Sequence, residues 1–272
     1  MSCVFSFLAS ALLTYVRMRI PRNIQLRPGC TLHMCWRCSD HENLSLLERD
    51  AVKDLLLACM GEYKDSYGVE IYDYAIMDNH AHTILKIRGV KEYAAFLQAA
   101  HTAFARRANI MLGRSGQFIK DLVKIMLLED EQALVNCQAY LHLNRWSCAL
   151  RVPPEEYRHC GYAFYAKGEE NPLLAVSPGF LALGTNDAER RLAFIEIVRG
   201  RMAEGKAQET AAVVKQLDNA PLFMGSKEYV ARESKAVRAV VREHKRHLRA
   251  QKPSAPEEIE KKRTVGSTSK KS

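Results

Sequence analysis

Residues 69–88 read VEIYDYAIMDNHAHTILKIR. Two runs rich in β-branched, aromatic and other apolar residues, 69–77 and 80–88, flank the turn-forming pair Asp78-Asn79. Apolar runs separated by a short polar turn are typical of an antiparallel hairpin. We therefore expect two consecutive strands here.

Upstream of this hairpin the pattern predicts a strand and then a helix. Residues 31–38 (TLHMCWRC) follow a Pro-Gly turn signal and have strand character. The segment Ser45-Leu-Leu-Glu48 has the form of a capping box, which predicts a helix start. Behind it, apolar residues recur every three or four positions until Gly68, which predicts an amphipathic helix. They are Val52, Leu55, Leu56, Cys59, Met60 and Tyr63.

Downstream, the apolar stripe from Tyr93 to Met111 predicts a second helix that ends at Gly113. Residues 118–127 suit either a strand or a helix, and we favour a strand. The acidic residues 129–131 then suit the positive end of a third helix. The order β-α-β-β-α-β-α predicts an α+β fold with a ferredoxin-like antiparallel sheet and helices on one face.

The composition indicates a soluble globular protein, since 47% of the 272 residues are hydrophobic and 26% are charged. Eight scattered cysteines do not indicate a disulfide scaffold, so we expect a cytoplasmic protein. The apolar run Val4–Val16 is too short to span a membrane and has no basic residue before Arg17, so we expect no membrane partner. Met18 is an alternative start of the chain.

Positive charge is concentrated at the end of the chain. The net charge is +9, and residues 234–272 hold twelve Lys or Arg against four Asp or Glu, a net +8. Five basic residues there follow one face of a predicted helix from about Arg232 to Arg249, which suits a polyanion; a solvated charged tail is the alternative reading. They are Lys235, Arg238, Arg242, Lys245 and Arg249.

Two small groups of residues have the chemistry of a metal-dependent site. His80 and His82 are two apart on a predicted strand, so both imidazoles face the same way and can reach one metal ion. Tyr140 and Asn144 are four apart on a predicted helix and share a face. A carboxamide oxygen is a suitable ligand for Mg²⁺ or Mn²⁺, and a phenol can act as a nucleophile.

Each group alone is weak, because a histidine pair occurs by chance and a helical tyrosine is usually a core aromatic. Together with their surroundings they resemble a known family. IMDNHAHTIL resembles the histidine-hydrophobic-histidine (HUH) strand MPNHVHLLL of the single-tyrosine transposases, and AYLHLNRWSCAL resembles their YIHLNPVRAGLV helix. GYAFYAKGEENPLL (161–174) and GSKEYV (225–230) resemble later segments of the branch called REP-associated tyrosine transposases.

The resemblance covers about residues 20–232 and implies four functional residues. His80, His82 and Asn144 would hold Mg²⁺ or Mn²⁺, and Tyr140 would attack a phosphate of single-stranded or hairpin DNA. The product would be a 5′-phosphotyrosine and a free 3′-OH. The substrates implied are hairpins of repetitive extragenic palindromes (REP), and the branch implies a monomer, with the dimer of the insertion-sequence relatives as the alternative.

Two residues depart from the family motifs. Asp78 replaces the proline of MPNH, and Arg145 replaces the proline after Asn144. Neither is a reacting group. Loss of the second proline would let the helix continue and shift Tyr140, and Asp78 adds a carboxylate near the expected metal.

The resemblance also divides the chain into four parts. We expect an N-terminal extension (1–19), an HUH catalytic domain (20–150), a C-terminal extension of the transposase region (151–232), and a basic helix with a disordered tail (233–272). Arg106, Arg107 and Arg114 are candidates for phosphate contact, with a solvated helix end as the alternative. His33, on the neighbouring strand, is a further site candidate that the sequence leaves open.

Two other functions remain as alternatives to DNA strand transfer. A domesticated descendant would bind structured single-stranded nucleic acid without cutting it. An unrelated metal hydrolase would use the histidine pair and have no need of Tyr140.

Overall fold

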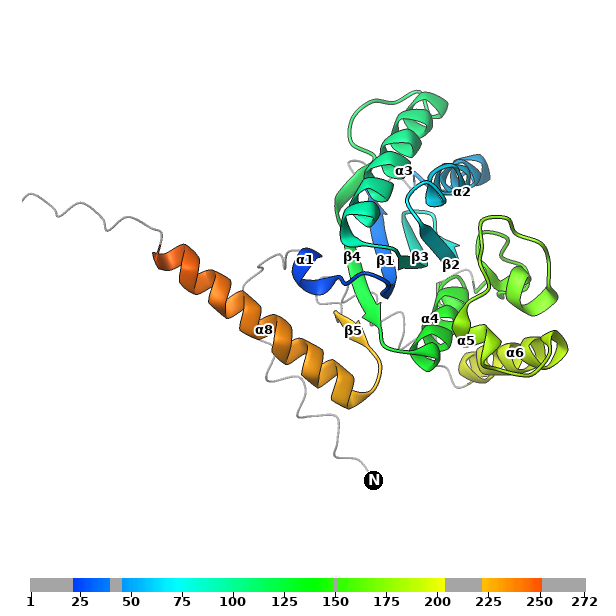
Figure 1. The fold of residues 1–272 in the computed structure, drawn as a ribbon. Coiled ribbons are helices and arrows are strands. Elements are labelled where there is room, and N and C mark those ends of the chain that lie inside the picture. The colour runs from blue at the N-terminus through cyan, green and yellow to red at the C-terminus, as the bar shows by residue number, and fades with distance from the viewer. Residues whose placement is uncertain (1–21, 40–45, 149–150, 204–221, 251–272) are drawn as a thin grey trace, which may run out of the picture.

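The computed structural model describes residues 22–39, 46–148, 151–203 and 222–250. At its centre is a five-stranded sheet in the order β2-β3-β1-β4-β5 (Figure 1). The strands are β1 (Thr31–Cys38), β2 (Val69–Ile76), β3 (His80–Ile87), β4 (Ile119–Leu128) and β5 (Phe223–Met224). The first four pair antiparallel, and β5 runs parallel to β4.

Two helices cover one face of this sheet. They are α2 (Asp50–Lys64) and α3 (Val90–Met111), which lie side by side in Figure 1. Alternate residues of β1, among them Leu32, Met34 and Trp36, pack beneath them in one core with Leu56 and Phe104. The predicted α+β class and the sheet with two helices on one face are therefore confirmed.

A third helix, α4 (Glu131–Leu143), packs on the opposite face of the sheet. Asp130 caps it, because its carboxylate accepts a hydrogen bond of 2.8 Å from the amide of Ala133. The predicted stripe Leu134, Cys137 and Leu141 is buried against Tyr72 and Ile84 of β2 and β3. This helix brings the Tyr140 segment over the face that carries the histidines.

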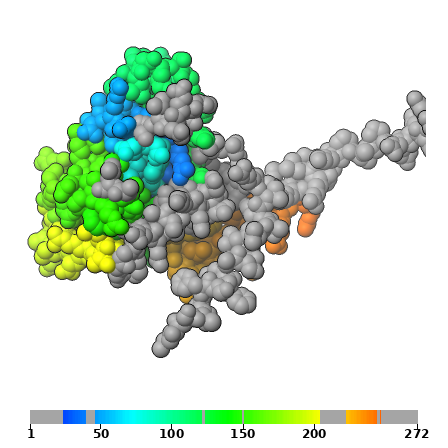
Figure 2. Space-filling view, turned by 180° about the vertical axis from the view of Figure 1, so that it is seen from behind, coloured from blue at the N-terminus to red at the C-terminus, as the bar shows by residue number. Residues whose placement is uncertain are grey.

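The remaining elements pack around α4 or lie near the C-terminal helix. A π-helical turn η1 (Ala163–Lys167) and helices α5 (Pro178–Leu181) and α6 (Asp187–Ala203) pack with α4. The short α1 (Arg22–Gln25) lies near the long α8 (Lys227–Ala250), which follows β5. From behind, the green and yellow segments around α4 and α6 form one side of the molecule, and the orange α8 lies on the other (Figure 2).

Several sequence-based boundaries need correction. The capping box does not start α2, because that helix begins at Asp50, after Arg49, with no side-chain cap. The buried Leu47 instead donates its amide to the Asp78 carbonyl at 2.9 Å, so this turn is held against the β2–β3 loop. The strand β5 was not predicted, and its parallel pairing makes the sheet mixed.

The third helix also ends sooner than the loss of proline at position 145 suggests. Its last helical residue is Leu143, and Asn144 is the C-cap with helical backbone angles. The chain then continues in turns, in which the Ser147 amide donates to the Leu143 carbonyl at 2.9 Å. The spacing of Tyr140 and Asn144 along one helical turn is kept.

Some expectations lie outside the described residues. These are the N-terminal extension (1–19), Ser45 of the capping box and the tail beyond residue 250. The basic helix is confirmed, and it begins earlier than expected, at Lys227. No helix within the described residues is long and apolar enough to cross a bilayer.

Candidate active site

The histidine pair lies at the start of β3, on the face of the sheet covered by α4. Cys35 of β1 is opposite His82, and Arg37 is opposite His80. Directly opposed residues of an antiparallel pair project from the same face, so β1 and β3 place these four side chains together. The His80 and His82 rings are 4.9 Å apart between centroids, and Ala81 is buried on the other face.

Tyr140 of α4 packs against His82 of this pair. Its ring stands edge-on to His82, with centroids 5.8 Å apart, and edge-on to His33, with centroids 6.2 Å apart. The phenol and the imidazoles come from positions 58 or more residues apart in the sequence. The structure thus brings together the strand and helix residues that the sequence patterns singled out, within one chain.

Asn144 lies one turn beyond Tyr140 and is buried. Its amide nitrogen donates to the Tyr140 carbonyl at 3.4 Å, and its side chain also hydrogen-bonds the phenol. Burial raises the pKa of the Tyr140 hydroxyl well above its usual value, and the hydrogen bond from Asn144 opposes that rise in part. The free phenol is therefore protonated at neutral pH and needs nearby positive charge to act as a nucleophile.

His33 was left undecided by the sequence, and the structure places it in the site. Its ring stacks on that of His82 at 5.0 Å, and its Nε2 is 2.8 Å from His82 Nδ1. His33 is paired with Ile84 in the strand register, two residues along from the Cys35–His82 pair. The signal in the sequence was its spacing of two and four residues from Cys35 and Arg37 on a strand, which puts it on their face.

The two candidate ligands have the same hydrogen-bonding arrangement. His80 Nδ1 lies 2.6 Å from Asn79 Oδ1, and His82 Nδ1 lies 2.8 Å from His33 Nε2. The Nε2 atoms of both rings are buried without a hydrogen-bond partner in the described structure. When Nδ1–H donates to its neighbour, Nε2 presents a lone pair, which is how a metal-binding histidine is held.

Burial also keeps these imidazoles neutral. It lowers the pKa of His33 and of His80 to about 4, and it lowers the pKa of His82 well below its usual value. Positive charge on Arg37 lowers the pKa of His80 and His82 further. A neutral imidazole is the form that binds a metal ion.

The imidazoles of His80 and His82 fit a divalent cation only if a side-chain carboxamide supplies a third ligand. Within the described ranges, no three His, Cys, Asp or Glu side chains are grouped so as to hold a metal ion. Two imidazole nitrogens with unused lone pairs, together with an amide oxygen, are compatible with Mg²⁺ or Mn²⁺. His80, His82 and Asn144 are the residues that would hold it.

The predicted phosphate-binding arginines lie away from the histidines. Arg106 lines a groove of about 560 Å³ between α3 and the first residues of β4. Arg107 donates a hydrogen bond of 2.7 Å to the Glu62 carboxylate of α2, so a DNA phosphate would have to compete with that carboxylate. Arg114 donates to the Asn109 side chain at 2.8 Å.

The basic face of α8 is exposed at three of its five predicted positions. Lys235, Arg238 and Arg242 face solvent, while Val237 and Val241 are buried. The side chains of Lys245 and Arg249 lie outside the described residues. Glu233, also buried, pairs with Arg27 and so ties the start of the helix to the body of the protein.

A comparison with protein families finds a match in the N-terminal part of the chain. Residues 27–118, about a third of the chain, match the family model described as "Transposase IS200 like". The matched region runs from β1 through α3 and contains His33, His80 and His82, while Tyr140 and Asn144 lie beyond it. The resemblance drawn from the sequence motifs is therefore confirmed for this region.

Two solved structures are similar to the chain. One is described as a REP-associated tyrosine transposase bound to a REP hairpin, with 12% identity and a TM-score of 0.45, covering 61% of this chain and 93% of that one. The other is a putative transposase from Deinococcus radiodurans R1, with 16% identity and a TM-score of 0.32, covering 44% and 94%. No curated protein matches the chain.

Proposed function

We propose that this protein is a transposase that nicks and rejoins single-stranded DNA at a hairpin of the REP type, through a covalent bond to Tyr140. The single observation that carries the proposal is the contact of the Tyr140 ring with His82 and His33, 5.8 and 6.2 Å away. The hairpin substrate is suggested by the sequence motifs. The site is built from one chain, which supports a monomer as the active species.

The chemistry assigned to this chain is a transesterification. The Tyr140 oxygen attacks the scissile phosphorus, a P–O bond to the phenol forms, and the bond to the 3′ oxygen breaks. The phenol loses a proton and the leaving 3′ oxygen gains one, so neither water nor ATP is consumed. A Mg²⁺ or Mn²⁺ ion held by His80, His82 and Asn144 would polarise the phosphate and stabilise charge on it.

The remaining side chains position the reactants. Asn79 and His33 hold the imidazole rings through their Nδ1 atoms. Arg37, exposed beside His80, is placed to contact a neighbouring phosphate of the strand. Arg106, Arg114 and the exposed basic face of α8 are proposed to bind more distant phosphates.

A test uses one hairpin oligonucleotide labelled separately at each end and incubated with the protein and Mn²⁺. A 5′-phosphotyrosine predicts that the 3′ label enters an SDS-stable adduct and that the 5′ label leaves on a fragment with a free 3′-OH. Tight binding without cleavage would favour the non-cutting descendant. Cleavage without an adduct would favour the unrelated hydrolase.

His33 provides a prediction about the metal site. We expect His33→Leu to weaken Mn²⁺ binding about 10- to 100-fold, because His82 Nδ1–H loses its acceptor. His33→Gln keeps an acceptor oxygen and should recover part of the affinity. Titration of free Mn²⁺ by electron paramagnetic resonance measures both; equal affinity in His33→Leu and wild type would show that His33 only fills space.

The basic helix provides a prediction about affinity. The triple variant Lys235→Gln/Arg238→Gln/Arg242→Gln should bind a hairpin more weakly, with a log K against log[salt] slope shallower by about 2 to 3. Removing three charges elsewhere, in Lys64→Gln/Lys86→Gln/Lys167→Gln, controls for net charge. If both triple variants change the slope equally, α8 has no specific part in binding DNA.

A further inference from the structure

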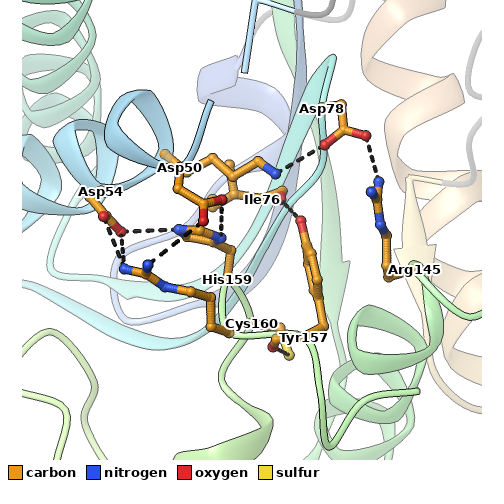
Figure 3. A network of polar contacts seen from close by, with 10 residues as sticks. Asp50, Asp54, Ile76, Asp78, Arg145, Tyr157, His159 and Cys160 are labelled. Carbon is orange, nitrogen blue, oxygen red and sulfur yellow. Dashed lines mark hydrogen bonds and ion pairs between the residues drawn. The ribbon is translucent and has the colours of Figure 1, made fainter. Parts of the chain in front are cut away.

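The two residues that depart from the family motifs contact each other. Asp78 precedes His80 by two positions, and Arg145 directly follows Asn144. The Arg145 Nη1 atom is 2.6 Å from Asp78 Oδ2 (Figure 3). An ion pair therefore joins the loop that leads into the histidine strand to the end of the tyrosine helix.

Asp78 is held from a second side by Lys53 of α2. The Lys53 Nζ atom is 2.9 Å from Asp78 Oδ1, and the lysine side chain is only 4% exposed. Burial alone would raise the pKa of the Asp78 carboxyl, but the bonds to Arg145 and Lys53 outweigh it and leave the pKa below its usual value. The carboxylate is thus occupied by two cations.

Backbone and aromatic contacts make this junction rigid. The Asn79 carbonyl accepts from the Cys38 amide at 2.9 Å, and the Met77 amide donates to the His80 carbonyl at 2.8 Å. The Tyr157 ring lies 5.4 Å from the Arg145 guanidinium, and its hydroxyl donates to the Ile76 carbonyl (Figure 3). The side chain of Arg145 is 14% exposed and that of Asp78 is 27% exposed, so the pair is partly shielded from solvent screening.

We propose that the Asp78–Arg145 ion pair positions the two halves of the active site, setting Asn144 and Tyr140 relative to His80 and His82. Proline would restrict the backbone at both positions, and here a partly buried charge pair supplies the restraint instead. Neither residue touches the reacting atoms, so both are positioning residues. This inference rests on the proposed function. It adds to that function the contact that aligns the metal ligands.

The variant chosen must leave Lys53 paired, because a buried lysine without a partner destabilises the fold. Arg145→Gln meets this condition, while Asp78→Asn does not. Arg158→Gln is the matched control, because Arg158 pairs with Asp54 of α2 at 2.9 Å and has no contact with either half of the site in the described structure. Arg145→Lys tests rescue of the charge.

Mn²⁺ affinity, measured by electron paramagnetic resonance without DNA, is the deciding readout. We expect Arg145→Gln to weaken it about tenfold or more, as Asn144→Ala does, because the third ligand is displaced. Arg145→Lys should recover most of the affinity, and Arg158→Gln should remain within about twofold of wild type because it lies outside the pair. A double variant Asn144→Ala/Arg145→Gln should bind no more weakly than Asn144→Ala, since Arg145 acts through Asn144.

Unchanged Mn²⁺ affinity in Arg145→Gln, with a loss in Asn144→Ala, would overturn the proposal and leave the ion pair a stabilising contact only. Additive losses in the double variant would also overturn it. If the wild-type protein binds no Mn²⁺, the positioning proposal and the metal site fail together. If Mn²⁺ binds as expected but no adduct forms with DNA, the proposed function fails and the positioning role stands.

Discussion

Replacing Tyr140 with phenylalanine is expected to abolish the covalent DNA adduct while hairpin affinity stays within about twofold of wild type. Phenylalanine keeps the ring that packs edge-on against His82 and His33 and removes only the hydroxyl. Loss of a covalent nucleophile typically reduces the rate of the chemical step by about 10³-fold or more. The yield of SDS-stable adduct from a 3′-labelled hairpin measures the effect.

The matched control for this variant is Tyr165→Phe. Tyr165 has a buried hydroxyl that donates to the Tyr72 carbonyl at 2.6 Å, and it lies outside the group of Tyr140, His33 and His82. Adduct formation should survive in Tyr165→Phe and be absent in Tyr140→Phe. The reverse pattern would assign the nucleophile to Tyr165 and remove the basis of the mechanism.

Replacing His82 with alanine is expected to have the second largest effect, a loss of about 100-fold or more in Mn²⁺ affinity together with loss of cleavage. The substitution removes one of two imidazoles whose Nε2 atoms are buried and unpartnered in the described structure. It also removes the contact between His82 Nδ1 and His33 Nε2, so the His33 ring loses the partner that orients it. Calorimetric titration with Mn²⁺ and the adduct assay report the two losses separately.

His101→Gln controls for the loss of a partly buried imidazole elsewhere in the fold. His101 packs against Trp36, with ring centroids 5.3 Å apart, on the face of the sheet opposite the site. It should bind Mn²⁺ as the wild type does. Equal Mn²⁺ affinity in His82→Ala and His101→Gln would exclude the histidine pair as the metal site.

Much of the fold was predictable because its elements have regular local patterns. The hairpin of β2 and β3 follows from two apolar runs around Asp78-Asn79, and α3 and α4 follow from their helical stripes. The start of α2 was not predictable from the capping box, because burial of Leu47 against the β2–β3 loop overrides the local helix signal. The strand β5 has only two residues and exists through its pairing with β4, a long-range contact that leaves no local pattern.

The site was predictable in part for the same reason. The two-residue spacing of His80 and His82 and the four-residue spacing of Tyr140 and Asn144 are local, so the sequence identifies each pair. That α4 crosses to the face opposite α2 and α3 is a property of the packed sheet, and this decides that the pairs meet. The roles of His33 and of the Asp78–Arg145 ion pair depend on contacts between residues 49 and 67 positions apart, which spacing alone does not reveal.

Identifying the tyrosine that becomes bound to DNA is the sharpest test of the proposed mechanism. The adduct formed with a hairpin and Mn²⁺ is digested with nuclease and trypsin, and the peptides are sequenced by mass spectrometry. The tryptic peptide 125–145 contains a single tyrosine, Tyr140, and we expect this peptide alone to carry the nucleotide phosphate on its phenol. A phosphate on any other tyrosine, or cleaved DNA with no modified peptide, would refute Tyr140 as the nucleophile.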